Sequence, residues 1–137
     1  MVWRWLWEVS MAIYGIGAYF SNGDVSKDFI TNSIVGTGWS KQYAPELFQY
    51  MQSLKVGDIV YIKSYPPSSL DIIIKGIGII KDDILVTNNI VTCGRNVVWK
   101  NIQTLRIPRP QEKNNVRANT MYEEFHPDVQ QFIINNL

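Results

Sequence analysis

Aromatic and hydrogen-bonding side chains recur beside turns in this chain, and they are the residue types that a binding pocket needs. Aromatic rings supply flat apolar walls, while lysine, serine and asparagine supply donors and acceptors. The candidate walls are Tyr14, Trp39 and Tyr65, and the candidate polar groups are Asn22, Lys63 and Ser64. Because Lys63-Ser64-Tyr65 runs from a predicted strand into a proline-rich loop, we predict that this segment lies at the mouth of the pocket.

Other interpretations of these residues stay open. Trp39 follows Gly36-Thr37-Gly38 and could equally fill the core, and Lys63 could be a solvated strand residue. Tyr14 and Tyr19 are five positions apart, so they face opposite sides of an ideal strand and cannot both line one pocket without a bulge.

Residues for bond-making chemistry do not form a recognisable set. Cys93 is the single cysteine and His126 the single histidine, which excludes an internal disulfide and a typical zinc site. The carboxylates in Asp82-Asp83 and Glu123-Glu124 are sequence neighbours, which point apart in a strand. We therefore expect no catalytic residues, metal or cofactor, and a small glycosylase or nuclease is the enzymatic alternative.

A locally basic stretch follows residue 94. We predict phosphate contacts from Arg95, Lys100, Arg106 and Arg109. A solvated linker would have the same composition, so this alternative stays open.

The composition predicts one folded domain. Hydrophobic residues make up 46% of the 137 residues and charged residues 18%, which is too apolar for a disordered chain. The net charge of +1 does not by itself call for a nucleic-acid or membrane partner. The apolar opening segment contains Arg4 and Glu8 and is too short to span a bilayer, so we expect no membrane anchor. With one cysteine, a reducing compartment, the cytoplasm, fits best.

The hydrophobic pattern is mainly that of strands. Extended segments are predicted at 12–20, 34–39, 59–65, 71–80, 84–86, 96–99 and 102–107. Helices are predicted from residue 24 or 26 to 32, at 40–54 and at 127–137. Turn residues at 81–83 separate two of the strands, and residues 108–119 have no clear pattern. Gly76 and Gly78 inside a strand favour a bulge or a close backbone approach, and hence a curved sheet.

Three segments follow from this pattern. Residues 1–10 form a segment that could be appended or alternatively initiated, because Met11 begins a natural first strand. Residues 11–110 form the β domain, and residues 111–137 form a polar connection and a final helix.

Short motifs in this order resemble the EVE-like domains of the PUA superfold, particularly those at the N-termini of McrB-type restriction proteins. The motifs are Tyr14-Gly15-Ile16-Gly17-Ala18-Tyr19, Gly36-Thr37-Gly38-Trp39, Met51-Gln52-Ser53-Leu54-Lys55-Val56-Gly57-Asp58, Ile62-Lys63-Ser64-Tyr65, Ile74-Lys75-Gly76-Ile77-Gly78 and Val98-Trp99. The resemblance covers roughly residues 12–100 and implies an α+β fold, a strongly curved sheet or pseudobarrel flanked by short helices.

The same resemblance implies a DNA or RNA reader that recognises a modified or flipped base, often a modified cytosine, in prokaryotic or phage defence or counter-defence. The chain has no GxxxxGK[ST] phosphate loop, so a motor is not expected with it. The alternative is a protein-interaction module or small homodimeric adaptor that binds no nucleic acid.

Overall fold

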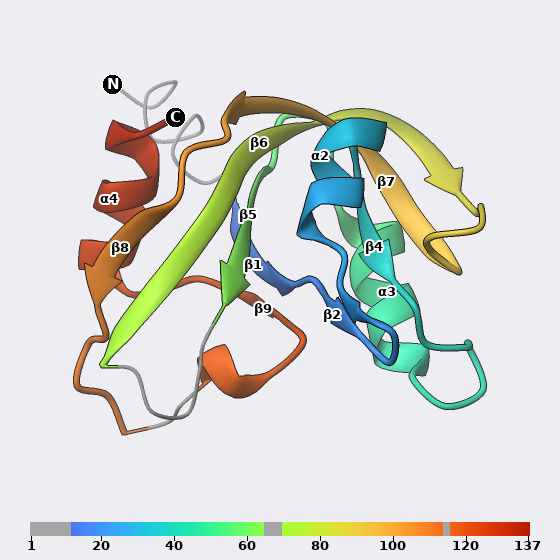
Figure 1. Cartoon of the computed structure of the whole chain (residues 1–137). Coiled ribbons are helices and arrows are strands. Elements are labelled where there is room, and N and C mark those ends of the chain that lie inside the picture. Colours follow the sequence, from blue (N-terminus) through green and yellow to red (C-terminus); the bar gives the residue numbers. More distant parts are fainter. Residues whose placement is uncertain (1–11, 65–69, 114–115) are drawn as a thin grey trace, which may run out of the picture.

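A mixed sheet with helices on both of its faces makes up the computed structural model, which describes residues 12–64, 70–113 and 116–137 (Figure 1). This is the expected α+β class. The predicted segment 1–10 and the predicted wall residue Tyr65 lie outside the described residues.

The main sheet has the strand order β4-β7-β6-β5-β1-β9, and β8 pairs with β6 off this path. These strands are β1 Ile13–Gly17, β4 Ile34–Thr37, β5 Ile59–Ser64, β6 Asp71–Val86, β7 Cys93–Asn101, β8 Leu105–Pro108 and β9 Met121–Glu123. β1 and β5 are parallel, whereas the other pairs are antiparallel. Because β4 and β9 at the two ends do not pair with each other, the sheet is not closed, which corrects the expectation of a barrel.

Three helices in the described residues agree with the predicted ones, with changed bounds. They are α2 Ser26–Asn32, α3 Pro45–Ser53 and α4 Pro127–Asn135. Pro45 and Pro127 stand in the first turns, where a missing backbone N–H costs nothing. The helix predicted at 40–54 starts only at Pro45, since residues 41–43 form a turn before it.

The sheet separates two apolar clusters. Alternation along β1 sends Tyr14 and Ile16 into the cluster that contains α2 and α3 residues, and Ile13 into the cluster that contains Val129 and Ile133 of α4. α4 therefore packs on the opposite face of β1 from α2 and α3.

The long strand β6 bends over the top of the molecule in Figure 1 and pairs with three strands. A side chain at Gly78 would put its Cβ 2.5 Å from Val97 Cγ1 and 2.8 Å from the Val98 carbonyl oxygen. The sequence prediction of a close backbone approach is therefore confirmed at this glycine.

The predicted turn at 81–83 is wrong, because β6 continues through it. Ile80 pairs with Val97 and Leu85 with Arg95, so residues 81–84 lie opposite Asn96 alone. This irregularity is stabilised by the Asn96 amide, which donates to the Asp82 carboxylate at 3.1 and 3.3 Å. The turn-like composition thus marks a large bulge within one strand.

Arg95 lies in the core, with 1% of its surface exposed. Its guanidinium donates to the carbonyl oxygens of Met51 at 2.8 Å and Leu54 at 2.6 Å, at the end of α3, and to that of Asp82 at 2.6 Å, in the bulge. This corrects the prediction that Arg95 contacts phosphate, because its guanidinium is buried and donates its hydrogen bonds to carbonyl oxygens inside the protein.

We predict that Arg95→Met lowers the free energy of unfolding by about 2–4 kcal/mol, because two buried carbonyl oxygens and one partly buried carbonyl oxygen lose their donor. Equilibrium urea denaturation measures the loss. Arg106→Met on the exposed side of β8 is the matched control and should change stability by no more than about 0.5 kcal/mol. Equal losses in the two variants would contradict the structural role of Arg95.

Candidate functional site

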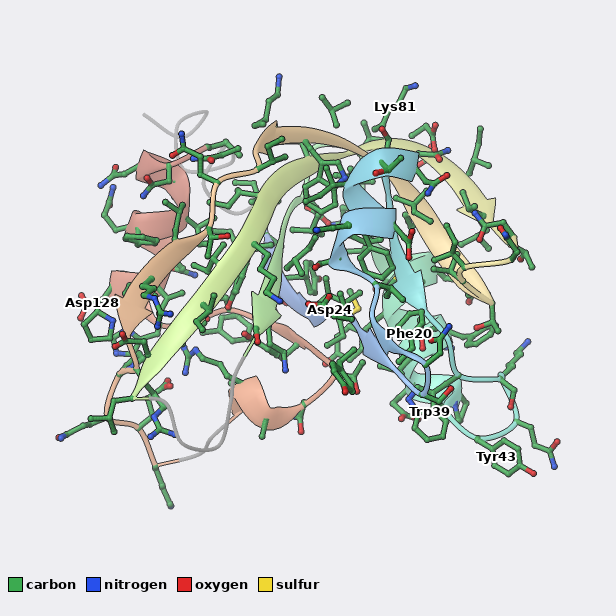
Figure 2. The ribbon with its side chains drawn as sticks, in the orientation of Figure 1. Phe20, Asp24, Trp39, Tyr43, Lys81 and Asp128 are labelled. Carbon is green, nitrogen blue, oxygen red and sulfur yellow. The ribbon has the colours of Figure 1, made fainter. Side chains whose placement is uncertain are left out.

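A cleft of about 610 Å³ opens between the segment that leads into α3 and the segment that leads into β9. Trp39 and Tyr43, 56% and 73% exposed, form its outer aromatic wall. In Figure 2 both rings project from the same corner of the molecule, below Phe20. The other lining residues are Ala44, Glu46, Leu47, Tyr50, Ala118, Asn119, Thr120 and Met121.

The backbone around Trp39 is fixed even though its ring is exposed. The Trp39 amide donates to the Thr37 hydroxyl at 3.1 Å, and the Thr92 hydroxyl contacts the carbonyl oxygens of Thr37, at 2.9 Å, and Trp39. The Phe20 ring packs against Gly38, where a Cβ would lie 2.9 Å from Phe20 Cδ2. Trp39 is therefore held out of the core by its surroundings, and the core interpretation of this residue is wrong.

Tyr14 is a supporting residue behind the cleft. It is buried in the sheet and meets Tyr50, which lines the cleft, edge to face at 6.2 Å between ring centroids. Burial, with a smaller contribution from Glu123, raises its pKa to about 12. The predicted direct wall role of Tyr14 is thus corrected to a position one layer deeper.

A polar cluster lies along β5. Its buried members are Tyr61, Arg117, Tyr122 and Glu124, and the half-buried Lys63 lies at its edge. The Tyr61 hydroxyl donates to Glu124 Oε1 at 2.7 Å, so the Tyr122 hydroxyl donates to Tyr61 at 2.7 Å. Burial raises the pKa of both tyrosines. These rings stay neutral and serve as donors.

The Arg117 guanidinium donates two hydrogen bonds to the Glu124 carboxylate. Its Nε donates to Oε1 at 3.0 Å, and its Nη2 donates to Oε2. Its Nη1 contacts Glu112. Although burial alone lowers the pKa of Arg117, these two carboxylates raise it above its ordinary value. The His126 amide also donates to Glu124 Oε2, at 3.1 Å, so all of these contacts satisfy the buried carboxylate.

Lys63 belongs to this cluster rather than to an open pocket mouth. Its Nζ donates to the Arg117 carbonyl oxygen at 2.8 Å and lies 5.8 Å from the centroid of the Tyr122 ring. Burial lowers its pKa from 10.5 to about 8.

Ser64 is half-buried at the end of β5, and Asn22 is exposed in the turn between β2 Tyr19–Phe20 and β3 Gly23–Asp24. Neither Asn22 nor Ser64 lines the cleft.

The other predicted phosphate contacts lie on β7 and in and beside β8. Lys100 and Arg106 are exposed and Arg109 is half-buried. Arg106 Nη1 lies 3.9 Å from the Asp71 carboxylate. Figure 1 places β8 on the opposite side of the molecule from α3, and none of these three basic residues lines the cleft.

Sequence reasoning missed Tyr43, Asn119 and Thr120 as cleft residues. Tyr43 stands four positions after Trp39, just before Pro45, and this spacing at a helix start was a usable signal. Asn119 and Thr120 gave no local signal, because they reach the cleft only through the pairing of β9 with β1.

In the described residues no group of three or more histidine, cysteine or acidic residues could hold a metal ion. Of the helices in the same residues, none has the length and apolarity to cross a bilayer. No protein-family model matches the chain, and no curated protein matches it. The resemblance to EVE-like domains stays a prediction.

Because the Lys63 pKa is lowered in the folded state, the unfolded chain holds more protons between about pH 8 and pH 10.5. We therefore predict that raising the pH from 7 to 9.5 increases the free energy of unfolding of the wild type relative to Lys63→Met. Urea denaturation at both pH values tests this prediction. A constant difference between the two proteins would show that the Lys63 amine is not desolvated.

Proposed function

We propose that this chain is a nucleic-acid-binding module that accepts an unstacked base in the cleft between Trp39 and Tyr43 on one side and residues 118–120 on the other. The observation that carries the proposal is the pair of exposed rings, held by a rigid backbone at the edge of a cleft. A stacked base gains about 1–3 kcal/mol from an aromatic side chain, which an exposed ring can supply.

Polar groups with unused hydrogen-bonding capacity support this proposal. The side chains of Glu46, Asn119 and Thr120 line the cleft, and none of them forms a hydrogen bond or ion pair with another described residue. Asn119 offers both donors and an acceptor, and Glu46 offers acceptors. Such groups can satisfy the edge of a base that has left its partner strand.

A single substitution at each ring tests the proposal. Trp39→Ala and Tyr43→Ala should each weaken binding of a single-stranded oligonucleotide at least tenfold, because a stacking surface is lost. The loss of stability should stay below about 1 kcal/mol, since both rings are largely exposed. Fluorescence anisotropy with oligonucleotides that carry unmodified, methylated, hydroxymethylated and glucosylated cytosine measures both affinity and preference.

Phe125→Ala is the matched control for these two variants. Phe125 is 71% exposed, between β9 and α4, and does not line the cleft. Its removal should leave affinity unchanged within twofold. If Phe125→Ala weakens binding as much as Trp39→Ala, the affinity comes from general apolar surface and the cleft is not the site.

Lys41 is the basic residue that we expect to contact a phosphate next to the bound base. It is exposed in the turn between Trp39 and Tyr43. Lys41→Gln should reduce the slope of log affinity against log salt by about one. Lys100→Gln on β7 is the control, and its slope should match that of the wild type with a short oligonucleotide. If Lys100→Gln reduces the slope and Lys41→Gln does not, the phosphates of the ligand lie across β7 and not beside Lys41.

A protein-interaction module is the second candidate function. A second cleft, of about 560 Å³, is lined by Val98 and Ile102, which are 41% and 59% exposed, beside the half-buried Trp99. Apolar surface of this kind suits a protein partner. High salt separates the two functions, because phosphate-led binding weakens steeply with salt and an apolar interface does not.

A further inference from the structure

The wall of the cleft opposite Trp39 is a short segment of three residues, Ala118 to Thr120. It begins at the last residue of η1 Val116–Ala118 and leads into β9. Its backbone makes two bonds that fix its path: the Asn119 amide donates to the Val116 carbonyl oxygen at 3.0 Å, and the Gly17 amide donates to that of Thr120 at 2.7 Å. Because the segment is only three residues long, the contacts at its two ends determine where it lies.

Lys63 reaches this segment from β5 by passing Gly17 of β1. Gly17 is the register partner of Lys63, and a Cβ at Gly17 would lie 3.6 Å from Lys63 Cε. The Lys63 stem thus runs at van der Waals distance past Gly17, and its amine meets the Arg117 carbonyl oxygen, one residue before the wall. Lys63 therefore joins two strands of the sheet to the start of the wall.

Charged groups surround this contact. Arg117 is bound to Glu124 and Glu112, and the Tyr61 hydroxyl is bound to Glu124. The two carboxylates hold the Arg117 side chain, and Lys63 is the side chain that binds its backbone carbonyl oxygen.

We infer that Lys63 is a positioning residue, which holds residues 118–120 where they complete the cleft and does not itself touch the ligand. This inference rests on the proposed function for its purpose, but the position of the wall can be measured in the free protein. Lys63, on the sheet, would then set the distance between residues 118–120 and Trp39, which is the width of the cleft.

Amide hydrogen exchange in the full chain without ligand tests the position of the wall. In Lys63→Met, which keeps the apolar stem, the amides of Gly17 and Asn119 should exchange at least about tenfold faster than in the wild type. The Glu124 amide, which donates to the Ile13 carbonyl oxygen at 2.7 Å, should keep its rate and serves as an internal reference. Lys63→Arg keeps a cationic donor and should restore slow exchange.

Lys75→Met is the matched control, because Lys75 on β6 pairs with Asp24 away from the wall. It should leave the exchange of Gly17 and Asn119 unchanged. Unchanged exchange at these amides in Lys63→Met would overturn the inference, as would an equal acceleration of the Glu124 amide, which would indicate general loosening.

Oligonucleotide binding separates this inference from the proposed function. Lys63→Met should weaken binding about five- to tenfold while the salt slope stays that of the wild type, and Lys63→Arg should recover most of the affinity. A slope reduced by about one would mean that Lys63 contacts a phosphate, which overturns the positioning role. A wild type that binds none of the oligonucleotides would reject the proposed function, while the exchange rates would still decide the inference.

Discussion

The buried guanidinium of Arg95 is the interaction on which the arrangement of α3 depends. Helix ends leave carbonyl oxygens without intrahelical donors, and Arg95 satisfies two of them at the end of α3. The same side chain binds the Asp82 carbonyl oxygen in the bulge of β6. Because one planar group serves both, the helix and the bend of the strand are fixed relative to each other. The aromatic wall of the cleft leads directly into this helix.

The second wall depends on a different principle. Residues 118–120 carry no apolar anchor of their own, and their position comes from polar contacts with β1 and β5. Buried polar contacts are directional, so a satisfied network specifies one geometry where apolar packing would allow several. One side of the cleft is thus positioned by a helix and the other by a polar cluster.

Most of the helices and strands could be predicted because their signals are local. Pro45 and Pro127 mark helix starts, and the apolar alternation at 59–64 and 71–80 marks two strands. The continuity of β6 through residues 81–83 could not be predicted, because it depends on Asn96 and Arg95 from another strand. β9 was missed for a similar reason: its three residues form a strand only by pairing with β1.

The candidate site was predicted in part. Trp39 lines the cleft as an accessible ring, whereas Tyr14 lies one layer behind and Lys63 belongs to the polar cluster. The residue types indicated that these side chains could stack on a ligand or form hydrogen bonds with it. Their depth depends on strand register and on neighbours such as Tyr50 and Tyr122, which sequence spacing does not reveal.

The parallel pairing of β1 with β5, together with that of β1 with β9, has a kinetic consequence. Both pairs join parts of the chain that are far apart in sequence, and closing such long loops costs entropy before any contact repays it. Folding is therefore expected on the millisecond-to-second scale of non-local topologies. Residues 118–121 line the cleft, so the cleft is not complete until β9 has made this long-range pairing with β1.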